Sequence, residues 1–299
     1  MPNNTQTQDF RKMRVDQVGS LAPPLKLRAA FSRFKHAEIS REDLTPFQDD
    51  AIREVIQAQE AIGFPIVTDG EFRRSNFQES FGAAVTGFHV AHEDKAMEGV
   101  NRNPFQRAEQ NFEAPGAPII TRRRAVERLK LAKNIPLDEY LFSKRVATKP
   151  VRQTVLSADR ISQRFDLQNS RNVYQSMDQF MADVVAISRQ LISELVQAGC
   201  RYISIDAPGY TAYVDSVSLE RMRSRGEDPD ENLARSIVAD NAIIAGFDGN
   251  HFRNSFVPRK SADCRPQDRK GRGAMASRRL LRCDRRAGIS GTQPPSVLA

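Results

Sequence analysis

The stretch that decides the fold is RYISIDAP, residues 201–208, a short apolar run that ends in an aspartate, an alanine and a proline. It follows directly on a segment, 177–198, whose apolar residues recur at helical spacing. A helix that leads into a buried strand in this way is typical of the βα units of a parallel sheet. The same alternation of strand and helix extends from here toward the N-terminus.

Three further runs with the pattern of buried strands end in polar or glycine-containing turns: RVDQVGS (14–20), PIVTDGE (65–71) and PVRQTVLS (150–157). Ser40 and Asp43 form a capping-box pattern, which predicts a helix of about five turns that ends near Ile62. Four strands with long crossovers make half of a (β/α)₈ barrel, so we predict an α/β fold of the TIM-barrel type, incomplete in this chain.

The segment from about 84 to 120 is rich in Asn, Pro, Gly and charge and has no clear period. We predict a long loop there, an excursion over the mouth of the barrel.

Composition bounds the class of protein. The chain has 299 residues, 39% of them hydrophobic, which suits one domain with a large core. Its three cysteines form no CxxC pair, the N-terminus lacks the apolar run of a signal peptide, and no apolar segment approaches the ~20 residues that cross a bilayer. We therefore expect a cytoplasmic protein with reduced thiols and no membrane partner.

The formal charge of +8 is concentrated at one end of the chain. Residues 250–299 hold 12 basic and 3 acidic residues, which leaves 33 basic and 34 acidic residues before them. The body is therefore close to neutral, and the basic excess belongs to a tail with little apolar periodicity.

Polar residues at the strand ends are the candidates for chemistry. Gly19 and Ser20 end the first run, Glu71 ends the second, and Asp206 stands near the end of the fourth. A glycine followed by a serine lets backbone N–H groups and a hydroxyl approach a carboxylate, while two acidic side chains in one pocket suit an ammonium group. Together they would fit an amino acid, although each signal alone is more often a turn, a helix cap or a surface charge.

Four blocks carry a resemblance to the cobalamin-independent methionine synthases, in particular to short proteins related to their C-terminal catalytic barrel. These blocks are QVGSLAPP (17–24), DDAIREVIQAQEAIGFPIVTDGEFRRSNFQESF (49–81), GAPIITRRRA (116–125) and AGCRYISIDAPGY (198–210). They occur in the family's order, and the resemblance covers roughly residues 12–249. It implies a (β/α)₈ barrel in which a zinc ion activates the thiol of homocysteine for methylation by a methyltetrahydrofolate.

The resemblance also implies roles for the strand-end residues. Gly19 and Ser20 match the pair that holds the homocysteine carboxylate, while Glu71 and Asp206 match acidic residues that hold its amino group. Ala207 stands where the family usually has a second acidic residue, so that strand end departs from the pattern.

The zinc ligands of the family are not recognisable in this chain. A zinc site that accepts a thiol needs His, Cys and acidic ligands and an open position. The family's His-x-Cys pair is absent, since Arg253 stands where a Cys would follow His251, and Cys264 and Cys283 have no metal-ligand spacing. Cys200, just before a strand, is most simply a core thiol. We therefore expect this chain to bind no zinc, and we identify no catalytic residue in its sequence.

A shifted reading frame explains the tail. Met275 and Ala276 must be encoded ATG GCN, which contains TGG, a tryptophan codon, one base later. With ordinary codon choices the same frame permits WHRDGYYDAIAER after this point and IHLCRGNQ from residue 254, and the second peptide contains the missing His-x-Cys pair. Both peptides resemble the family and share one phase.

Three domain predictions follow: a disordered N-terminus (1–12), a partial barrel (13–249), and an out-of-frame, disordered basic tail (250–299). We expect the substrates to be homocysteine and 5-methyltetrahydrofolate or its polyglutamates. A related zinc enzyme that alkylates coenzyme M is the alternative, but a sulfonate has no ammonium to pair with Glu71 and Asp206. A nucleic-acid-binding tail is the third hypothesis, and the lack of aromatic interleaving argues against a specific nucleic-acid partner.

Overall fold

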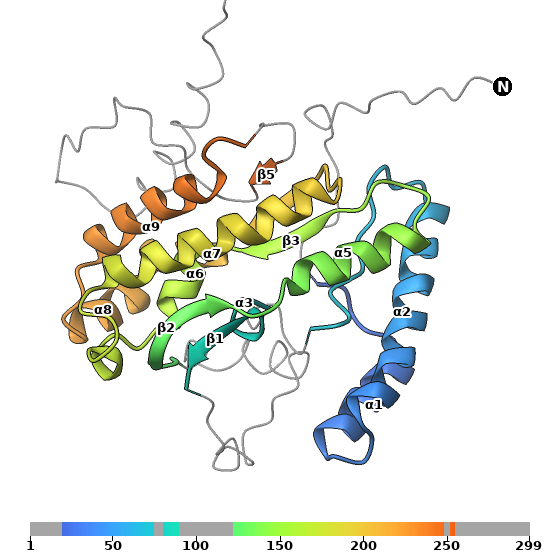
Figure 1. Ribbon diagram of the computed structural model, residues 1–299, viewed down its shortest axis with the longest axis horizontal. Helices are drawn as coiled ribbons and strands as arrows, with labels where there is room; N and C mark the ends of the chain where they lie inside the picture. Colours follow the sequence, from blue (N-terminus) through green and yellow to red (C-terminus); the bar gives the residue numbers. More distant parts are fainter. Residues whose placement is uncertain (1–19, 75–79, 90–121, 248–251, 255–299) are drawn as a thin grey trace, which may run out of the picture.

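The computed structural model of the protein describes residues 20–74, 80–89, 122–247 and 252–254 (Figure 1). Their centre is a parallel sheet with strand order β3-β4-β5, whose bounds are β3 Gln153–Leu156, β4 Ile203–Asp206 and β5 Phe252–Asn254. Leu156 lies opposite Asp206, so the carboxyl ends of β3 and β4 are level. An isolated parallel bridge between Val67 and Val151 adds the 65–71 segment beside β3.

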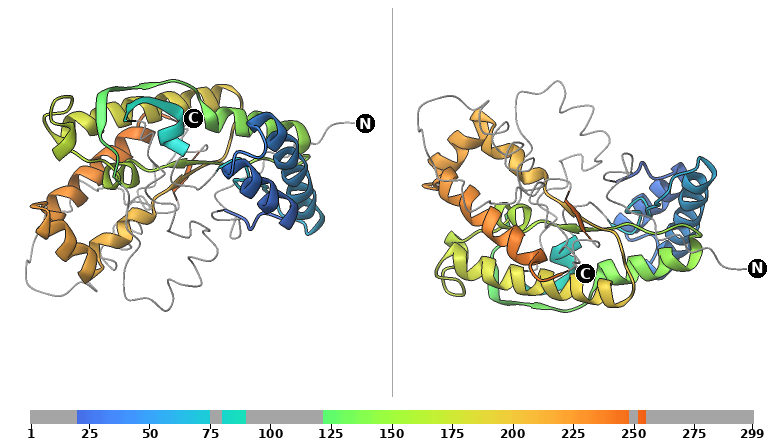
Figure 2. Two further views of the ribbon diagram at one scale, coloured as in Figure 1. Left: turned by 90° about the horizontal axis from the view of Figure 1, so that it is seen from below. Right: turned by 90° about the horizontal axis from the view of Figure 1, so that it is seen from above.

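Helices connect the strands on the pattern expected of βα units. Helix α5 (Ile135–Val146) precedes β3, and α6 (Ala158–Gln163) and α7 (Met177–Gln197) join β3 to β4. The connection from β4 to β5 contains the 3₁₀ helix η5 (Pro208–Tyr213), α8 (Ser216–Ser224) and α9 (Pro229–Ile244). Helices α7 and α9 pack against each other, as Figure 2 shows. Within the described part of the chain the sheet does not close into a barrel.

Two helices at the N-terminal end pack together, α1 (Leu25–Lys35) and α2 (Arg41–Ala61). The predicted capping box begins α2: Ser40 Oγ accepts from the Asp43 N–H at 3.1 Å, and the Ser40 N–H donates to Asp43 Oδ2 at 3.0 Å. The α1–α2 pair lies at the opposite end of the molecule from α8 and α9 (Figures 1 and 2).

A two-stranded antiparallel ribbon was not expected from the sequence. It consists of β1 (Val85–Phe88), which follows the short helix α3 (Ser80–Ala84), and β2 (Ala125–Leu131). The prediction of a loop from about residue 84 is therefore wrong for 85–88, because pairing with β2 supplies the hydrogen bonds that local pattern did not reveal. Residues 90–121 lie outside the described part of the chain.

The core is continuous between the sheet and its helices. Phe165 and Phe180 stack with ring centroids 3.7 Å apart, and Tyr174 meets both rings edge-on. The Tyr174 hydroxyl accepts from the Leu129 N–H on β2 and donates to Asp183 on α7, so the only polar atom of this aromatic group is paired at both sides.

The strand predictions have unequal outcomes. The runs at 150–157 and 201–208 contain β3 and β4, and the helix predicted over 177–198 is α7. The run at 65–71 forms only the bridge at Val67, because Gly70 and Glu71 take left-handed backbone angles that end any extended strand there.

The predictions for the two ends of the chain are largely untested. Residues 1–19, and with them the predicted disordered N-terminus and most of the run at 14–20, lie outside the described residues, as do 255–299. Within the predicted tail, residues 252–254 form β5, which pairs with β4. In the described ranges, no helix is both long enough and apolar enough to span a membrane.

Candidate functional site

Ser20 and Glu71 meet at the carboxyl side of the sheet. The Ser20 hydroxyl donates to Glu71 Oε2 at 2.6 Å. The neighbouring Leu21 N–H donates to the Gly70 carbonyl at 3.1 Å, which fixes the segment after residue 20 against the turn that contains Glu71. Two of the residues selected from the sequence are therefore in direct contact, whereas Gly19 lies outside the described residues.

The turn at 68–71 presents Glu71 from a strained backbone. Glu71 has φ +61°, a left-handed angle that costs a residue with a Cβ on the order of 1–2 kcal/mol. The turn is held by Asp69 Oδ1, which accepts from the Glu71 N–H at 2.9 Å, and by Thr68 Oγ1, which accepts from the Gly70 N–H at 3.0 Å. Gln59 on α2 anchors it by hydrogen bonds to the N–H and carbonyl of Thr68. Strain that is held by so many contacts is typical of functional sites.

Asp206 ends β4, one strand away from this turn. The carboxyl ends of β3 and β4 are level, and the Val67 bridge places the 68–71 turn on the other side of β3. Partial burial raises the pKa of Asp206, and the charge of Glu71 raises it further. The two carboxyl groups therefore interact electrostatically, and a positive group of a ligand between them would stabilise their charged forms.

Asp69 adds a second buried acid under Glu71. It is 5% exposed, and its Oδ2 atom has no hydrogen-bond partner among the described residues. Burial raises the pKa of Asp69 to about 7, the charge of Glu139 on α5 acts in the same direction, and Arg74 opposes both. Asp69, Glu71 and Asp206 therefore offer carboxyl groups that can pair with a cationic group of a ligand, while Arg74, Arg152 and Arg160 supply positive charge around them.

A separate cluster of polar side chains joins α6, which follows β3, to η5 and α9. Asp159 Oδ1 accepts from the hydroxyls of Tyr213 and Ser236 at 2.9 and 2.8 Å. Asp240 accepts from the Tyr210 hydroxyl at 2.8 Å and from the Ala158 N–H at 2.6 Å. These bonds tie the loop after Asp206 to α9, so the cluster supports the position of the site.

The described residues do not fit a zinc ion. Among them, no group of three His, Cys, Asp or Glu side chains could hold a metal. Cys200 is fully buried, as expected of a core thiol, and burial raises its pKa to about 12. His251, Cys264 and Cys283 lie outside the described residues, so the absence of the zinc ligands stays a prediction.

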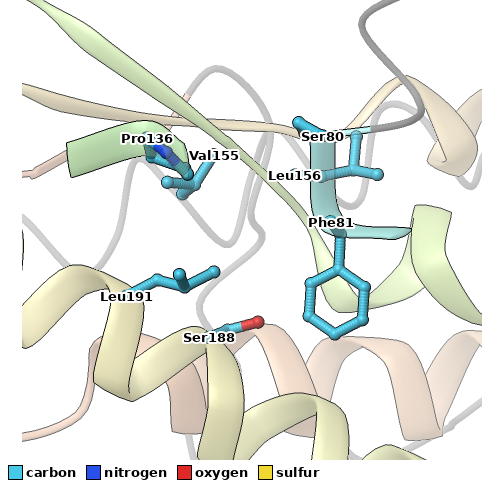
Figure 3. A pocket seen from close by; sticks show the side chains of 7 residues that line it. All are labelled: Ser80, Phe81, Pro136, Val155, Leu156, Ser188 and Leu191. Carbon is cyan, nitrogen blue, oxygen red and sulfur yellow. The ribbon is translucent and has the colours of Figure 1, made fainter. Parts of the chain in front are cut away.

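One small cavity is lined by α3, α5, β3 and α7 (Figure 3). Its volume is about 10 Å³, room for a single water at most, and its lining is mainly apolar: Ser80, Phe81, Pro136, Val155, Leu156, Ser188 and Leu191. It is too small for an amino acid and holds none of the candidate site residues.

Comparison with known proteins shows the family to which this chain belongs. Residues 14–243 match the family described as cobalamin-independent synthase, catalytic domain, and the chain belongs to this family. A methionine synthase of Sulfurisphaera tokodaii is 26% identical over 67% of this chain and 53% of its own length. The chain spans about half the length of the curated relatives that it matches.

Solved structures of similar proteins confirm the fold class. A protein of Listeria monocytogenes described as a vitamin-B12-independent methionine synthase has a TM-score of 0.59 at 17% identity, covering 80% of this chain and 63% of its own. A B12-independent methionine synthase of Shewanella in complex with selenomethionine has a TM-score of 0.52 at 19% identity, covering 77% and 57%. The described residues form an incomplete barrel of this methionine synthase type, as predicted.

Arg74, Glu139 and Asp69 are site residues that sequence reasoning did not select. Arg74 follows Glu71 by three residues, and Asp69 precedes it by two, so both stand in a block already known to resemble the family. Glu139 had no local signal, because its place beside Arg74 depends on the packing of α5 against β3.

Proposed function

We propose that the carboxyl edge of the sheet binds homocysteine, with Glu71 and Asp206 at its ammonium group and with Gly19 and Ser20 at its carboxylate, to which the Ser20 hydroxyl turns from Glu71 when the ligand binds. The contact of Ser20 with Glu71, one strand away from the end of β4, is the observation that carries this proposal. An ammonium group would pair with the carboxylates of Glu71 and Asp206. Support comes from the relative of Shewanella, which was solved with selenomethionine, an amino acid of the same class.

The reaction proposed for the family fold is transfer of a methyl group from 5-methyltetrahydrofolate, or its polyglutamates, to the homocysteine sulfur. The S–CH₃ bond forms as the N–CH₃ bond of the donor breaks, the thiol loses its proton, and the nitrogen of the departing tetrahydrofolate takes up one, so that the proton count balances. Ser20, Glu71 and Asp206 would bind and orient the amino-acid end. Because the described residues do not fit zinc, we assign no step to the metal, and we propose that this chain binds the amino acid without transferring the methyl group.

A calorimetric titration of the full chain separates homocysteine from the alternative thiol, coenzyme M. Homocysteine carries the ammonium group that Glu71 and Asp206 would pair with, whereas coenzyme M carries a sulfonate that both acids repel. We expect homocysteine to bind at least about tenfold more tightly, since a charged hydrogen bond contributes roughly 1.5–3 kcal/mol. Tighter binding of coenzyme M would reject the homocysteine proposal and favour the other zinc alkyltransferases.

The basic tail is part of the same proposal. We propose that a one-base shift near codon 250 replaced the end of the barrel, which held the family's His-x-Cys pair, with the arginine-rich sequence of residues 250–299. The competing function of the tail, nucleic-acid binding, predicts DNA affinity that falls steeply with salt and is lost on deletion of 250–299.

A further inference from the structure

Arg74 lies between two buried acidic side chains. Its Nη1 atom is 3.3 Å from Glu71 Oε1, and the side chains of Arg74 and Glu71 are 5% and 6% exposed. The other oxygen of Glu71, Oε2, accepts from the Ser20 hydroxyl. Arg74 and Ser20 therefore hold the two ends of one carboxylate, and this fixes the direction in which Glu71 can meet a ligand.

The guanidinium group of Arg74 is itself held by two other elements. Its Nε and Nη2 atoms donate to Glu139 on α5 at 3.0 and 2.7 Å, in the bidentate geometry that suits arginine and carboxylate. Nη2 also donates to the Thr154 carbonyl on β3 at 2.9 Å, and Gln153 of the same strand donates to Glu139. Arg74 thus couples the 68–71 turn to α5 and β3.

The positive charge of Arg74 also balances the buried carboxyl groups around it. Asp69, Glu71 and Glu139 are buried around Arg74, so its loss would leave three carboxylates close together in a site of low polarity. Burial alone would lower the pKa of Arg74, but Glu139, Glu71 and Asp69 together raise it, and the group stays charged. Without this cation the neighbouring carboxylates would repel one another, and Glu71 would no longer be held in its position.

We propose that Arg74, anchored by Glu139, is a positioning residue that aims the carboxylate of Glu71 at the ammonium group of the amino-acid ligand. This inference rests on the proposed function, because it requires an amino acid at Glu71. It assigns to Arg74 no contact with the ligand itself.

Titration calorimetry of the full chain with methionine and with 4-(methylthio)butanoate tests this role, because the second compound lacks only the ammonium group. We expect Arg74→Gln to weaken methionine binding at least tenfold and to leave binding of the analogue within twofold. Arg74→Lys, which keeps the charge, should recover much of the loss. The control Arg128→Gln removes an arginine that is also bidentate to a carboxylate, Asp183, and should change neither affinity.

Two results overturn the proposal: Arg74→Gln that binds methionine like the wild type, or an equal loss of methionine and the analogue, which indicates a purely structural role. If Arg74→Gln does not fold, Glu139→Gln takes its place, with a several-fold loss for methionine alone expected and wild-type affinity contradicting the anchor. A wild-type chain that binds no methionine rejects the proposed function and this inference with it. A wild-type chain that binds methionine, with variants that bind it equally well, rejects only the role of Arg74.

Discussion

Glu71 concentrates the chemistry of the site in one side chain. It is buried, its backbone is left-handed, and its carboxylate is held by Ser20 and Arg74. Ser20, Glu71 and Asp206 could be selected from the sequence because strand ends and a family resemblance both point to them. The partners of Glu71 that lie on other elements could not, since only the folded chain brings Glu139 of α5 to Arg74.

Replacement of Glu71 by glutamine should weaken homocysteine binding at pH 7 by about ten- to one-hundredfold, because the ammonium group loses a charged acceptor in a buried site. Calorimetry with Glu71→Gln measures this. The control Glu227→Gln removes a half-buried acid that pairs with Arg122 and Arg225, away from the site, and should leave the affinity unchanged. Equal affinities of wild type and Glu71→Gln would exclude Glu71 from the ligand contact.

Gly70 is required by both backbone and packing. Its φ is +67°, and an added Cβ would lie 2.9 Å from Phe72 Cε1 and 3.2 Å from Leu21 Cβ. Gly63 has φ +86° with open space around it, so Gly63→Ala carries the backbone strain alone, about 1–2 kcal/mol. We expect Gly70→Ala to lower the free energy of unfolding by roughly a further 1–3 kcal/mol in urea titrations. Equal losses in the two variants would show that the close packing around Gly70 has no energetic weight.

At the scale of elements, pattern reasoning was strongest where local signals are strong. The capping box and apolar period of α2, and the broad apolar face of α7, predicted both helices to within about one residue. The β1–β2 ribbon was missed because its strands are short, one of them lies in a charged stretch, and the pairing is between segments far apart in the sequence. Helices α8 and α9 were not predicted, although Asp228, followed by Pro229 and two acidic residues, is a helix-start pattern and does begin α9.

The link between α9 and α6 should make stability depend on pH. Burial raises the folded-state pKa of Asp240 to about 7, from an ordinary value of 3.8. The folded protein therefore holds this proton more tightly than the unfolded chain, so the contribution is full below pH 4 and is lost as pH rises through 7. At about 1.36 kcal/mol per pKa unit the loss is on the order of 4 kcal/mol.

Urea unfolding between pH 4 and 8 measures this dependence. Asp240→Asn, which stays neutral, should flatten the decline in the free energy of unfolding, whereas the exposed control Asp50→Asn should follow the wild type. A wild-type free energy that rises from pH 4 to 7 with a slope unchanged in Asp240→Asn would contradict this assignment.

In the whole molecule, residues 1–249 are close to neutral, whereas residues 250–299 carry the basic excess. Residues 14–243 match the catalytic domain of the family, and the described strands form only part of its barrel. Four separated blocks of sequence predicted this fold class. The register of β3 with β4 and the ion pairs of Arg74 could not be predicted from the sequence and are known only from the structure. The extent of the barrel bears directly on the proposed frameshift.

Genomic DNA read on both strands across codons 240 to 300 tests the proposed shift of frame. We expect the frame one base later to encode IHLCRGNQ and then WHRDGYYDAIAER, which would restore a His-x-Cys pair after β4. DNA that cannot encode these peptides in that frame rejects the shift and leaves residues 250–299 as a genuine part of the protein.

The central claim is that this chain holds an amino acid by its ammonium group. The most direct measurement is the affinity of the full chain at pH 7 for homocysteine and for 4-mercaptobutanoate, which differs from it only by the missing amino group. We predict that the analogue binds at least about tenfold more weakly, because Glu71 and Asp206 lose their cationic partner. Equal affinities, or no binding of homocysteine, would contradict it.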